Sequence, residues 1–268
     1  VETNVDGTVK TTRFDGKGNY DKMTVDSSGR LIEKQWNIDG NTNIHKFNPD
    51  GSSSLRIEGK DGSLHIKDFR TDGSIRERIY NTDKTTEARV TNSDKSTRVT
   101  KFDTNKRMYE RIETTRDGVV TTSKFKTDGT TIVKTDYLDR HSVETVYNSN
   151  NQMISSHEIN PNGTYVNKKY DVSGRVIEKI SSTETGSIYI ERYNSDSTYT
   201  KRVIESGNDV ISETTFEQRG KVVKESLEYK DGSMIEKKYN SDGTTEIKTV
   251  NSDKTYDIKK IDSKGKIL

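Results

Sequence analysis

The sequence predicts an all-β fold, in which about twelve tandem β-hairpin repeats of roughly 22–23 residues form a long antiparallel meander. Three observations support this prediction: turn signals recur every eleven or so residues, a large apolar residue precedes every second turn, and the composition is too polar for an ordinary core. We expect a single-layer sheet, open or spiralling, that runs through residues 1–268 as one continuous array. The array is expected to be a segment of a longer protein.

The composition favours ordered strands with a thin core. Hydrophobic residues make up 27% of the chain and charged residues 33%, values that border on those of disordered proteins. Disordered chains are rich in proline and poor in aromatic residues, whereas this chain has 2 Pro, 13 Tyr and 6 Phe, with Val, Ile and Thr spread evenly. Such residues suit pleated, half-buried strands.

The turn signals are Asx-Gly and Asx-Lys pairs that recur along the chain. Asp39-Gly40, Asp50-Gly51, Asp61-Gly62 and Asp72-Gly73 are spaced at eleven, and the series continues with Asp83-Lys84, Asp94-Lys95, Asn105-Lys106, Asp117-Gly118, Asp128-Gly129, Asn162-Gly163, Ser173-Gly174, Asp231-Gly232, Asp242-Gly243 and Asp253-Lys254. Asp-Gly and Asn-Gly are favoured where a turn requires positive φ, and Asx side chains cap their own turns. Between the turns lie about seven residues of strand type, as in 74–80.

Large apolar residues precede every second turn, usually followed by Asp or Asn. The series is Phe14, Trp36, Ile57, Tyr80, Phe102, Phe125, Tyr147, Tyr170, Tyr193, Phe216, Tyr239 and Ile261. In the structural interpretation, each ring covers its neighbours and stabilises a strand end. In the functional interpretation, rings about 9.6 Å apart form a ladder on which an extended glycan stacks. The structural interpretation is favoured, because every copy needs the same part whether or not it binds a ligand.

Two stretches carry a resemblance to a known family. Residues 170–177, Tyr-Asp-Val-Ser-Gly-Arg-Val-Ile, combine an aromatic residue, Asp, a turn Gly and Arg, and residues 26–32 repeat the Gly-Arg-hydrophobic step. This pattern resembles the YD (Rhs-type) repeat, and the repeat length alone is similar to that of MORN repeats. The YD resemblance implies strand-turn-strand units that wind into long sheets, sometimes closed into shells around toxin domains of bacterial secreted proteins. This chain departs from the family in being more polar, short for a closed shell, and without a recognisable cleavage region or C-terminal cargo.

Side-chain alternation indicates a sheet with water on both sides. Ile75, Glu77 and Ile79 point to one face, and Arg76, Arg78 and Tyr80 to the other, so both faces carry charges. A sheet with one dry face would alternate more cleanly. A closed propeller of six four-stranded blades is the alternative, but no 44-residue period lies over the 22-residue one.

The sequence carries no recognisable catalytic or cofactor motif. The formal charge is +2 with interleaved signs, so no basic stripe for nucleic acid is present, and no apolar run reaches the roughly 18 residues of a membrane helix. His45, His65, His141 and His157 lack metal-ligand spacing, and no Cys is present. The Asp-rich turn at 48–51 suggests Ca²⁺, but turn capping explains it better because the calcium β-roll signature is missing. We expect no enzyme, no cofactor, no metal, no nucleic acid and no membrane insertion.

The predicted function is therefore that of a non-enzymatic structural or scaffold module of a bacterial secreted or cell-surface protein, such as a stalk or partial shell. The alternative is an adhesin or phage-fibre-like module that binds carbohydrate along the aromatic row. A protein or polysaccharide partner fits either hypothesis, and flanking domains or a capping partner are expected because terminal strands would otherwise expose their edges. An engineered repeat is disfavoured because the copies are degenerate.

Overall fold

A computed structural model describes residues 1–207 and 210–268. The chain divides into two compact units, Val1–Thr127 and Asp128–Leu268. The described residues form strands and turns without a helix, so this part of the chain has no helix that could span a membrane.

The strands of each unit follow one another as antiparallel neighbours. The first unit contains β1 (Glu2–Thr3), β2 (Val9–Phe14), β3 (Tyr20–Val25), β4 (Leu31–Ile38), β5 (Asn41–Phe47), β6 (Ser53–Glu58), β7 (Leu64–Phe69), β8 (Ile75–Tyr80), β9 (Thr86–Thr91), β10 (Thr97–Phe102), β11 (Met108–Thr114) and β12 (Val120–Phe125). The second contains β13 (Thr131–Asp136), β14 (Ser142–Tyr147), β15 (Met153–Ile159), β16 (Tyr165–Tyr170), β17 (Val176–Ser182), β18 (Ile188–Tyr193), β19 (Tyr199–Ile204), β20 (Val210–Phe216), β21 (Val222–Tyr229), β22 (Met234–Tyr239), β23 (Thr245–Val250) and β24 (Tyr256–Ile261).

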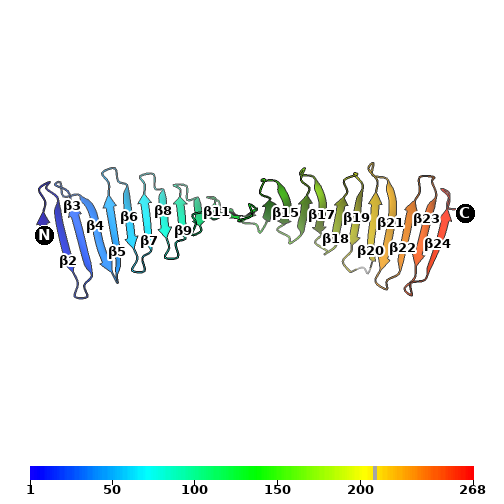
Figure 1. Cartoon of the computed structure of the whole chain (residues 1–268), viewed down its shortest axis with the longest axis horizontal. Helices are drawn as coiled ribbons and strands as arrows, with labels where there is room; N and C mark the ends of the chain where they lie inside the picture. The colour runs from blue at the N-terminus through cyan, green and yellow to red at the C-terminus, as the bar shows by residue number, and fades with distance from the viewer. Residues whose placement is uncertain (208–209) are drawn as a thin grey trace. The chain divides into compact units, whose positions relative to one another are not determined.

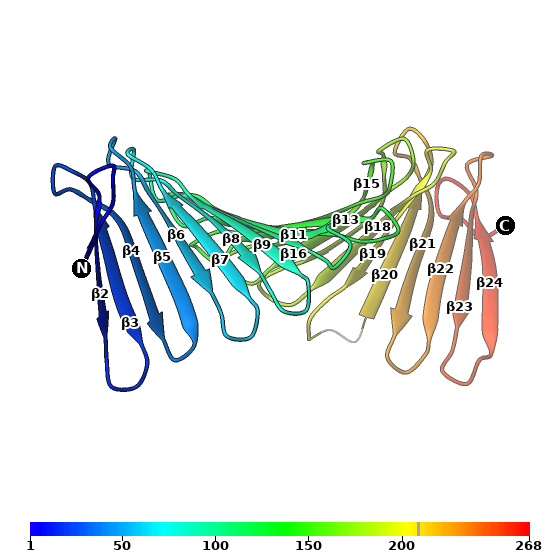
Figure 2. The same ribbon diagram turned by 60° about the vertical axis from the view of Figure 1, so that its left-hand side comes forward.

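Each unit is a single open layer. Within a unit the strands lie side by side in chain order. The turns lie at both ends of the strands, and no second layer covers either face (Figures 1 and 2). No strand pairing within the described part of either unit joins its first strand to its last. The predicted fold class, an all-β single-layer meander of about twelve hairpins, is confirmed, because the described residues form 24 strands.

Most turns share one geometry, which the turn at Asn48–Ser52 illustrates. The backbone N–H of Asn48 donates to the carbonyl of Ser52 (2.9 Å), and the N–H of Gly51 donates to the carbonyl of Asn48 (3.2 Å). Gly51 has φ 88°, so the loop is a type I turn followed by a left-handed residue. The positive φ predicted for the Asx-Gly turns is confirmed, and the lysines of the Asx-Lys turns, Lys84, Lys95, Lys106 and Lys254, also have positive φ.

One turn differs from this pattern. Ile38 pairs with Asn41 across the two-residue loop Asp39-Gly40, in which φ is 53° at Asp39 and 86° at Gly40. Positive φ at both positions defines a type I′ turn, for which Asp-Gly is a favoured sequence. The turn therefore starts two residues after Trp36, whereas it starts one residue after Phe14, Tyr80 and Phe102.

The sheet has almost no buried interior. Among the described residues no hydrophobic side chain is buried, and only Thr24 (6% exposed) and Ser74 (9%) are buried at all. Ion pairs between neighbouring strands supply cross-strand contacts instead, as at Lys67–Glu77 (2.6 Å) and Lys169–Glu178 (2.8 Å). The thin core expected from the composition is thus observed.

In the strand pairings that the structure describes, five hairpins contain a β-bulge immediately after the turn. The register shifts between β3 and β4, β10 and β11, β14 and β15, β16 and β17, and β20 and β21. In every case the turn ends in Arg, Gln or Lys and two hydrophobic residues follow: Arg30-Leu31-Ile32, Arg107-Met108-Tyr109, Gln152-Met153-Ile154, Arg175-Val176-Ile177 and Lys221-Val222-Val223. In a bulge, two residues of one strand lie opposite a single residue of its partner strand. The second hydrophobic residue is therefore the extra residue in each of these strands.

Candidate functional site

Most of the predicted aromatic row is brought together on one face of each unit. Residues directly opposite in antiparallel strands share a face, so the register can be followed from strand to strand. In the first unit, Phe14, Tyr80, Phe102 and Phe125 share a face beside the same edge of the sheet. In the second unit, the residues that share one face and one edge are Tyr147, Tyr170, Tyr193, Phe216, Tyr239 and Ile261.

Trp36 and Ile57 do not belong to the row. Phe14 lies opposite Tyr20, whereas Trp36 lies opposite Asp21, one position away and therefore on the other face of the sheet. Trp36 and Ile57 both pair with Asn43, which places them on a common face. Both residues precede the first residue of their turn by two positions, whereas the row residues precede it by one.

Three rings of the second unit cover one another. Tyr199 and Phe216 stack with centroids 4.4 Å apart and planes at 7°, and Tyr193 stacks on Tyr199 at 5.8 Å and 28°. Tyr199 was not part of the predicted series; the available signal was its place at the start of a strand, directly opposite Tyr193 across the turn. These faces are occupied by neighbouring rings, which supports the structural interpretation of the row.

Tyrosine hydroxyls of the row bond to neighbouring polar groups. The hydroxyl of Tyr239 donates to Oε2 of Glu225 (2.7 Å), and this bond raises the pKa of Tyr239. The hydroxyl of Tyr193 donates to Oε2 of Glu191 (2.9 Å); burial of the phenol, followed by this bond, raises the pKa of Tyr193. These bonds join Tyr193 to a carboxylate of its own strand and Tyr239 to a carboxylate of the neighbouring strand.

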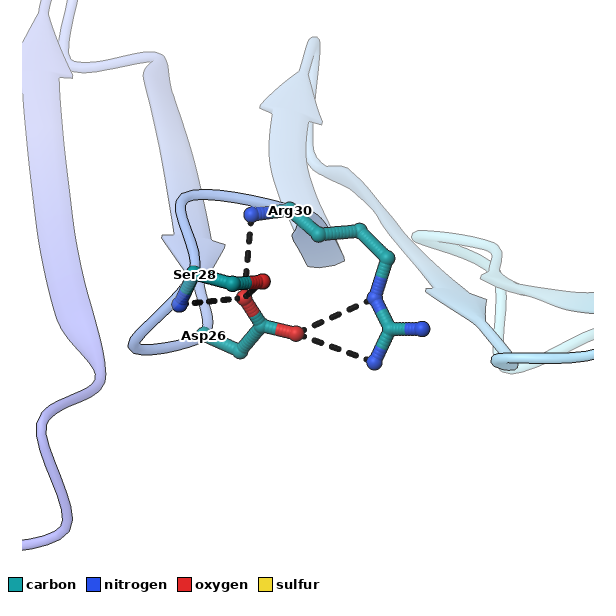
Figure 3. A network of polar contacts seen from close by, with 3 residues as sticks. All are labelled: Asp26, Ser28 and Arg30. Atoms are coloured by element: carbon teal, nitrogen blue, oxygen red, sulfur yellow. Dashed lines mark hydrogen bonds and ion pairs between the residues drawn. The ribbon is translucent and has the colours of Figure 1, made fainter.

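The Asp-x-x-Gly-Arg turns are closed by an internal ion pair (Figure 3). Asp26 Oδ1 accepts from the backbone N–H and hydroxyl of Ser28 and from the backbone N–H of Arg30, while Oδ2 accepts from the Arg30 guanidinium at 2.9–3.0 Å. These bonds, that of the Ser28 hydroxyl first, lower the pKa of Asp26 to about 2. Asp171 and Arg175 repeat the arrangement with an ion pair of 2.7 Å.

A second type of turn places the carboxylate at the third position. Asp50 Oδ1 accepts from the backbone N–H and hydroxyl of Ser52, at 2.9 and 2.6 Å, and the amide of Asn48 donates to the same hydroxyl. The bond from the Ser52 hydroxyl is the main reason that the pKa of Asp50 lies below its usual value. Asn162 replaces the carboxylate in the turn before β16 and accepts the same two bonds from Thr164. The Asp-rich turns thus use their oxygens within the turn.

The four histidines lie in separate environments. His45 packs against Phe47 (4.1 Å between centroids), and burial lowers its pKa. His65 lies near Glu77 (3.7 Å), and burial lowers its pKa as well. Within residues 1–207 and 210–268, no three His, Asp or Glu side chains form a group that could hold a metal ion. The other two histidines contact polar or aromatic partners: His141 contacts Glu158 and Tyr137, and His157 contacts Asn167.

Two shallow hollows lie beside aromatic side chains. The larger, about 670 Å³, is in the first unit at β2, β3 and β4, and its lining includes Phe14, Tyr20 and Trp36. The smaller, about 370 Å³, is in the second unit between the turns at 171–175 and 194–198, beside Ile177 and Tyr193. These hollows are the places where a ligand could contact a ring.

Comparison of the sequence with models of known protein families gives no match, and no curated protein matches it. The resemblance to YD repeats, carried by residues 170–177 and 26–32, therefore stays a prediction. The structure does explain the pattern that carries it, because Asp and Arg form the ion pair and the following hydrophobic residues form the bulge.

Proposed function

We propose that this chain is a non-enzymatic scaffold segment of a bacterial secreted or cell-surface protein, in which repeated hairpins set the spacing between attached parts. The supporting observation is that each repeat closes its own turn with its own side chains. Asp26–Arg30 and Asp50–Ser52 are bonds within single turns, and the ion pairs between strands join nearest neighbours. A protein of this kind has a length proportional to the number of repeats.

The carbohydrate ladder along the aromatic row has less support. A glycan that stacked on the row would need free ring faces, and Tyr199 and Phe216 cover each other's faces. The row therefore contributes mainly to the cohesion of neighbouring strands in this proposal.

A distance measurement within the first unit tests the scaffold function. Ser27→Cys and Arg116→Cys place labels in two turns on the same edge, eight strands apart, or about 38 Å along the sheet. The chain has no cysteine, so both sites can be spin-labelled selectively. Deleting residues 49–70 removes two strands and leaves the turn Asn48-Thr71-Asp72-Gly73-Ser74, which has the same residue types as the turns it replaces. The label distance should fall by about 10 Å, the width of two strands.

The undeleted double-cysteine protein is the matched control, and circular dichroism checks that the strands are retained. A shorter distance with intact strands would support a spacer built of interchangeable repeats. Loss of the folded first unit after removal of one repeat would contradict the proposal, because stability would then not be divided among nearest neighbours.

A further inference from the structure

Trp36 is the only tryptophan of the chain and lies in the larger hollow. It is on the face opposite to the aromatic row of the first unit, so no ring of that row stacks on it. The hollow extends from Trp36 toward the edge of the sheet, where Phe14 (74% exposed) and Ile38 (53%) are accessible. An indole in an open hollow provides a flat apolar surface for a ring-shaped ligand.

Charged side chains of both signs surround the indole. Arg13 and Asp21 are directly opposite one another, Asp21 is directly opposite Trp36, and Lys34 lies two residues before Trp36 on the same strand. All four therefore share one face, and all line the hollow. Lys34 Nζ lies over the Trp36 ring, 5.6 Å from its centroid, and a ligand that stacks on that face displaces this side chain, which is 40% exposed. With one carboxylate and two cations on this face, and Asp15 at the adjoining edge, the lining is close to neutral.

Asp21 has hydrogen-bonding capacity that the protein does not use. Its Oδ1 is buried without a hydrogen-bond partner, and its Oδ2 has only a long contact of 3.7 Å with Lys34. An unpaired acceptor of this kind costs free energy, which a donor on a ligand can recover. The side chain is 42% exposed, so a rotation of the carboxylate can turn an oxygen toward the hollow.

We propose that the hollow at Trp36 binds a neutral pyranose ring of a polysaccharide. The apolar face of the sugar would lie on the indole, one hydroxyl would donate to Asp21, and another would accept from Arg13. This combination of a flat apolar surface with a few convergent polar groups of balanced charge matches an uncharged polyol ring. An anionic ligand would meet the Asp21 carboxylate beside the ring, and a cationic one would meet Arg13 and Lys34. The site is independent of the proposed scaffold function.

Tryptophan fluorescence tests the proposal directly, because Trp36 is the only tryptophan and selective excitation of indole over the 13 tyrosines reports on this residue alone. The probes are neutral tetrasaccharides of glucose, galactose and mannose, with tetragalacturonate as the charged comparison. We expect a saturable change in emission with at least one neutral probe and none with tetragalacturonate. Ligand-observed NMR on Trp36→Leu should show at least a tenfold weaker affinity, and Asp21→Ala should weaken binding about tenfold.

Tyr170→Leu is the matched control, because it removes a ring of the row from the second unit and should leave the affinity unchanged. Circular dichroism of each variant verifies the fold, and Asp21→Ala keeps the tryptophan reporter if Trp36→Leu fails to fold. The inference is overturned if none of the neutral probes changes the emission, if only tetragalacturonate binds, or if Trp36→Leu or Asp21→Ala binds as tightly as the original protein. None of these outcomes bears on the distance measurement that tests the scaffold function.

Discussion

Tyr199 and Phe216 stack face to face across β19 and β20, with ring centroids 4.4 Å apart and planes at 7°. The two residues are directly opposite each other in the register. Because no apolar side chain of the described residues is buried, stacking between part-exposed rings is one of the nonpolar contacts left to hold neighbouring strands together. It gives a measurable estimate of how much ring contacts contribute to cohesion between repeats.

A double-mutant cycle with Tyr199→Leu and Phe216→Leu should give a coupling of about 0.5–1.5 kcal/mol in the free energy of unfolding. Urea unfolding of the four proteins measures it. The matched control is the opposite pair Tyr239 and Thr245, which has no ring on one side and should couple more weakly. Equal coupling in the two pairs would mean that stacking adds nothing beyond ordinary cross-strand contact.

The fourth residue of most turns has positive φ. Replacing a glycine there should lower the free energy of unfolding, and replacing a lysine there by glycine should raise it. Gly73 has φ 81° and no neighbour that a Cβ atom would meet, so Gly73→Ala tests the backbone alone and should destabilise by about 1–2 kcal/mol. Lys84 already has φ 68°, and Lys84→Gly should stabilise by up to about 1 kcal/mol, because relief of strain is partly offset by the entropy of the unfolded chain. Thermal unfolding compares both variants, and destabilisation by Lys84→Gly would show that its side chain matters more than its φ.

Acid should destabilise the protein through its turns. The hydrogen bonds of the turn hold the pKa of Asp26 at about 2 and lower the pKa values of Asp50, Asp61 and Asp94 from their usual value. Carboxylates with a lowered pKa contribute stability that is complete above the unfolded value and is lost as the pH falls through the folded value. The midpoint of urea unfolding should therefore stay level above about pH 5 and fall progressively toward pH 2.

The triple variant Asp50→Asn, Asp61→Asn and Asp94→Asn provides the control for this dependence. Asn162 shows that an amide oxygen can accept the same bonds, so the variant should remain folded at pH 7. Its loss of stability between pH 5 and pH 2 should be smaller than that of the original protein. An identical pH profile would assign the acid sensitivity to other groups.

The bulges should depend on the extra residue that they accommodate. Deleting Ile177, together with replacement of residues 171–175 by the Asn-Ser-Asp-Gly-Thr turn of 240–244, should restore a regular ladder and leave a folded protein. Deleting Ile190 from the regular strand β18 is the matched comparison, and it should disrupt folding because a one-residue slip moves every following side chain to the other face. Amide hydrogen exchange across β16, β17 and β18 distinguishes the two. Equal loss of protection would contradict the assignment of Ile177 as the extra residue.

Much of the fold could be predicted from the sequence because the turns carry local information. Asp50-Gly51 and Asp83-Lys84 mark the positive-φ position in the sequence itself, and the spacing of such pairs fixes the strand length. The cross-strand ion pairs also follow from the interleaved charges, since Lys67 and Glu77 are opposite once the turn is placed.

The details that were missed depend on single-residue differences in register. Trp36 fits the period of the aromatic series and is followed by Asn, but its turn begins one residue later, which moves the ring to the other face. The bulges had a signal that a period analysis does not detect: a long polar residue at the end of the turn before two hydrophobic residues, as at Arg175-Val176-Ile177. Three hairpins with Ser or Thr at the same turn position and two hydrophobic residues after it, at Tyr165, Ile188 and Met234, have no bulge.

The absence of buried apolar side chains in the described residues has a calorimetric consequence. Unfolding raises the heat capacity mainly by exposing apolar surface to water, and polar exposure lowers it. Both faces of this sheet are already exposed to water in the folded state. The heat-capacity change of unfolding should therefore lie well below the average for globular proteins, which is about 12–15 cal/mol/K per residue. Its stability curve would be unusually flat, so cooling should weaken this protein far less than it weakens a globular domain of the same length.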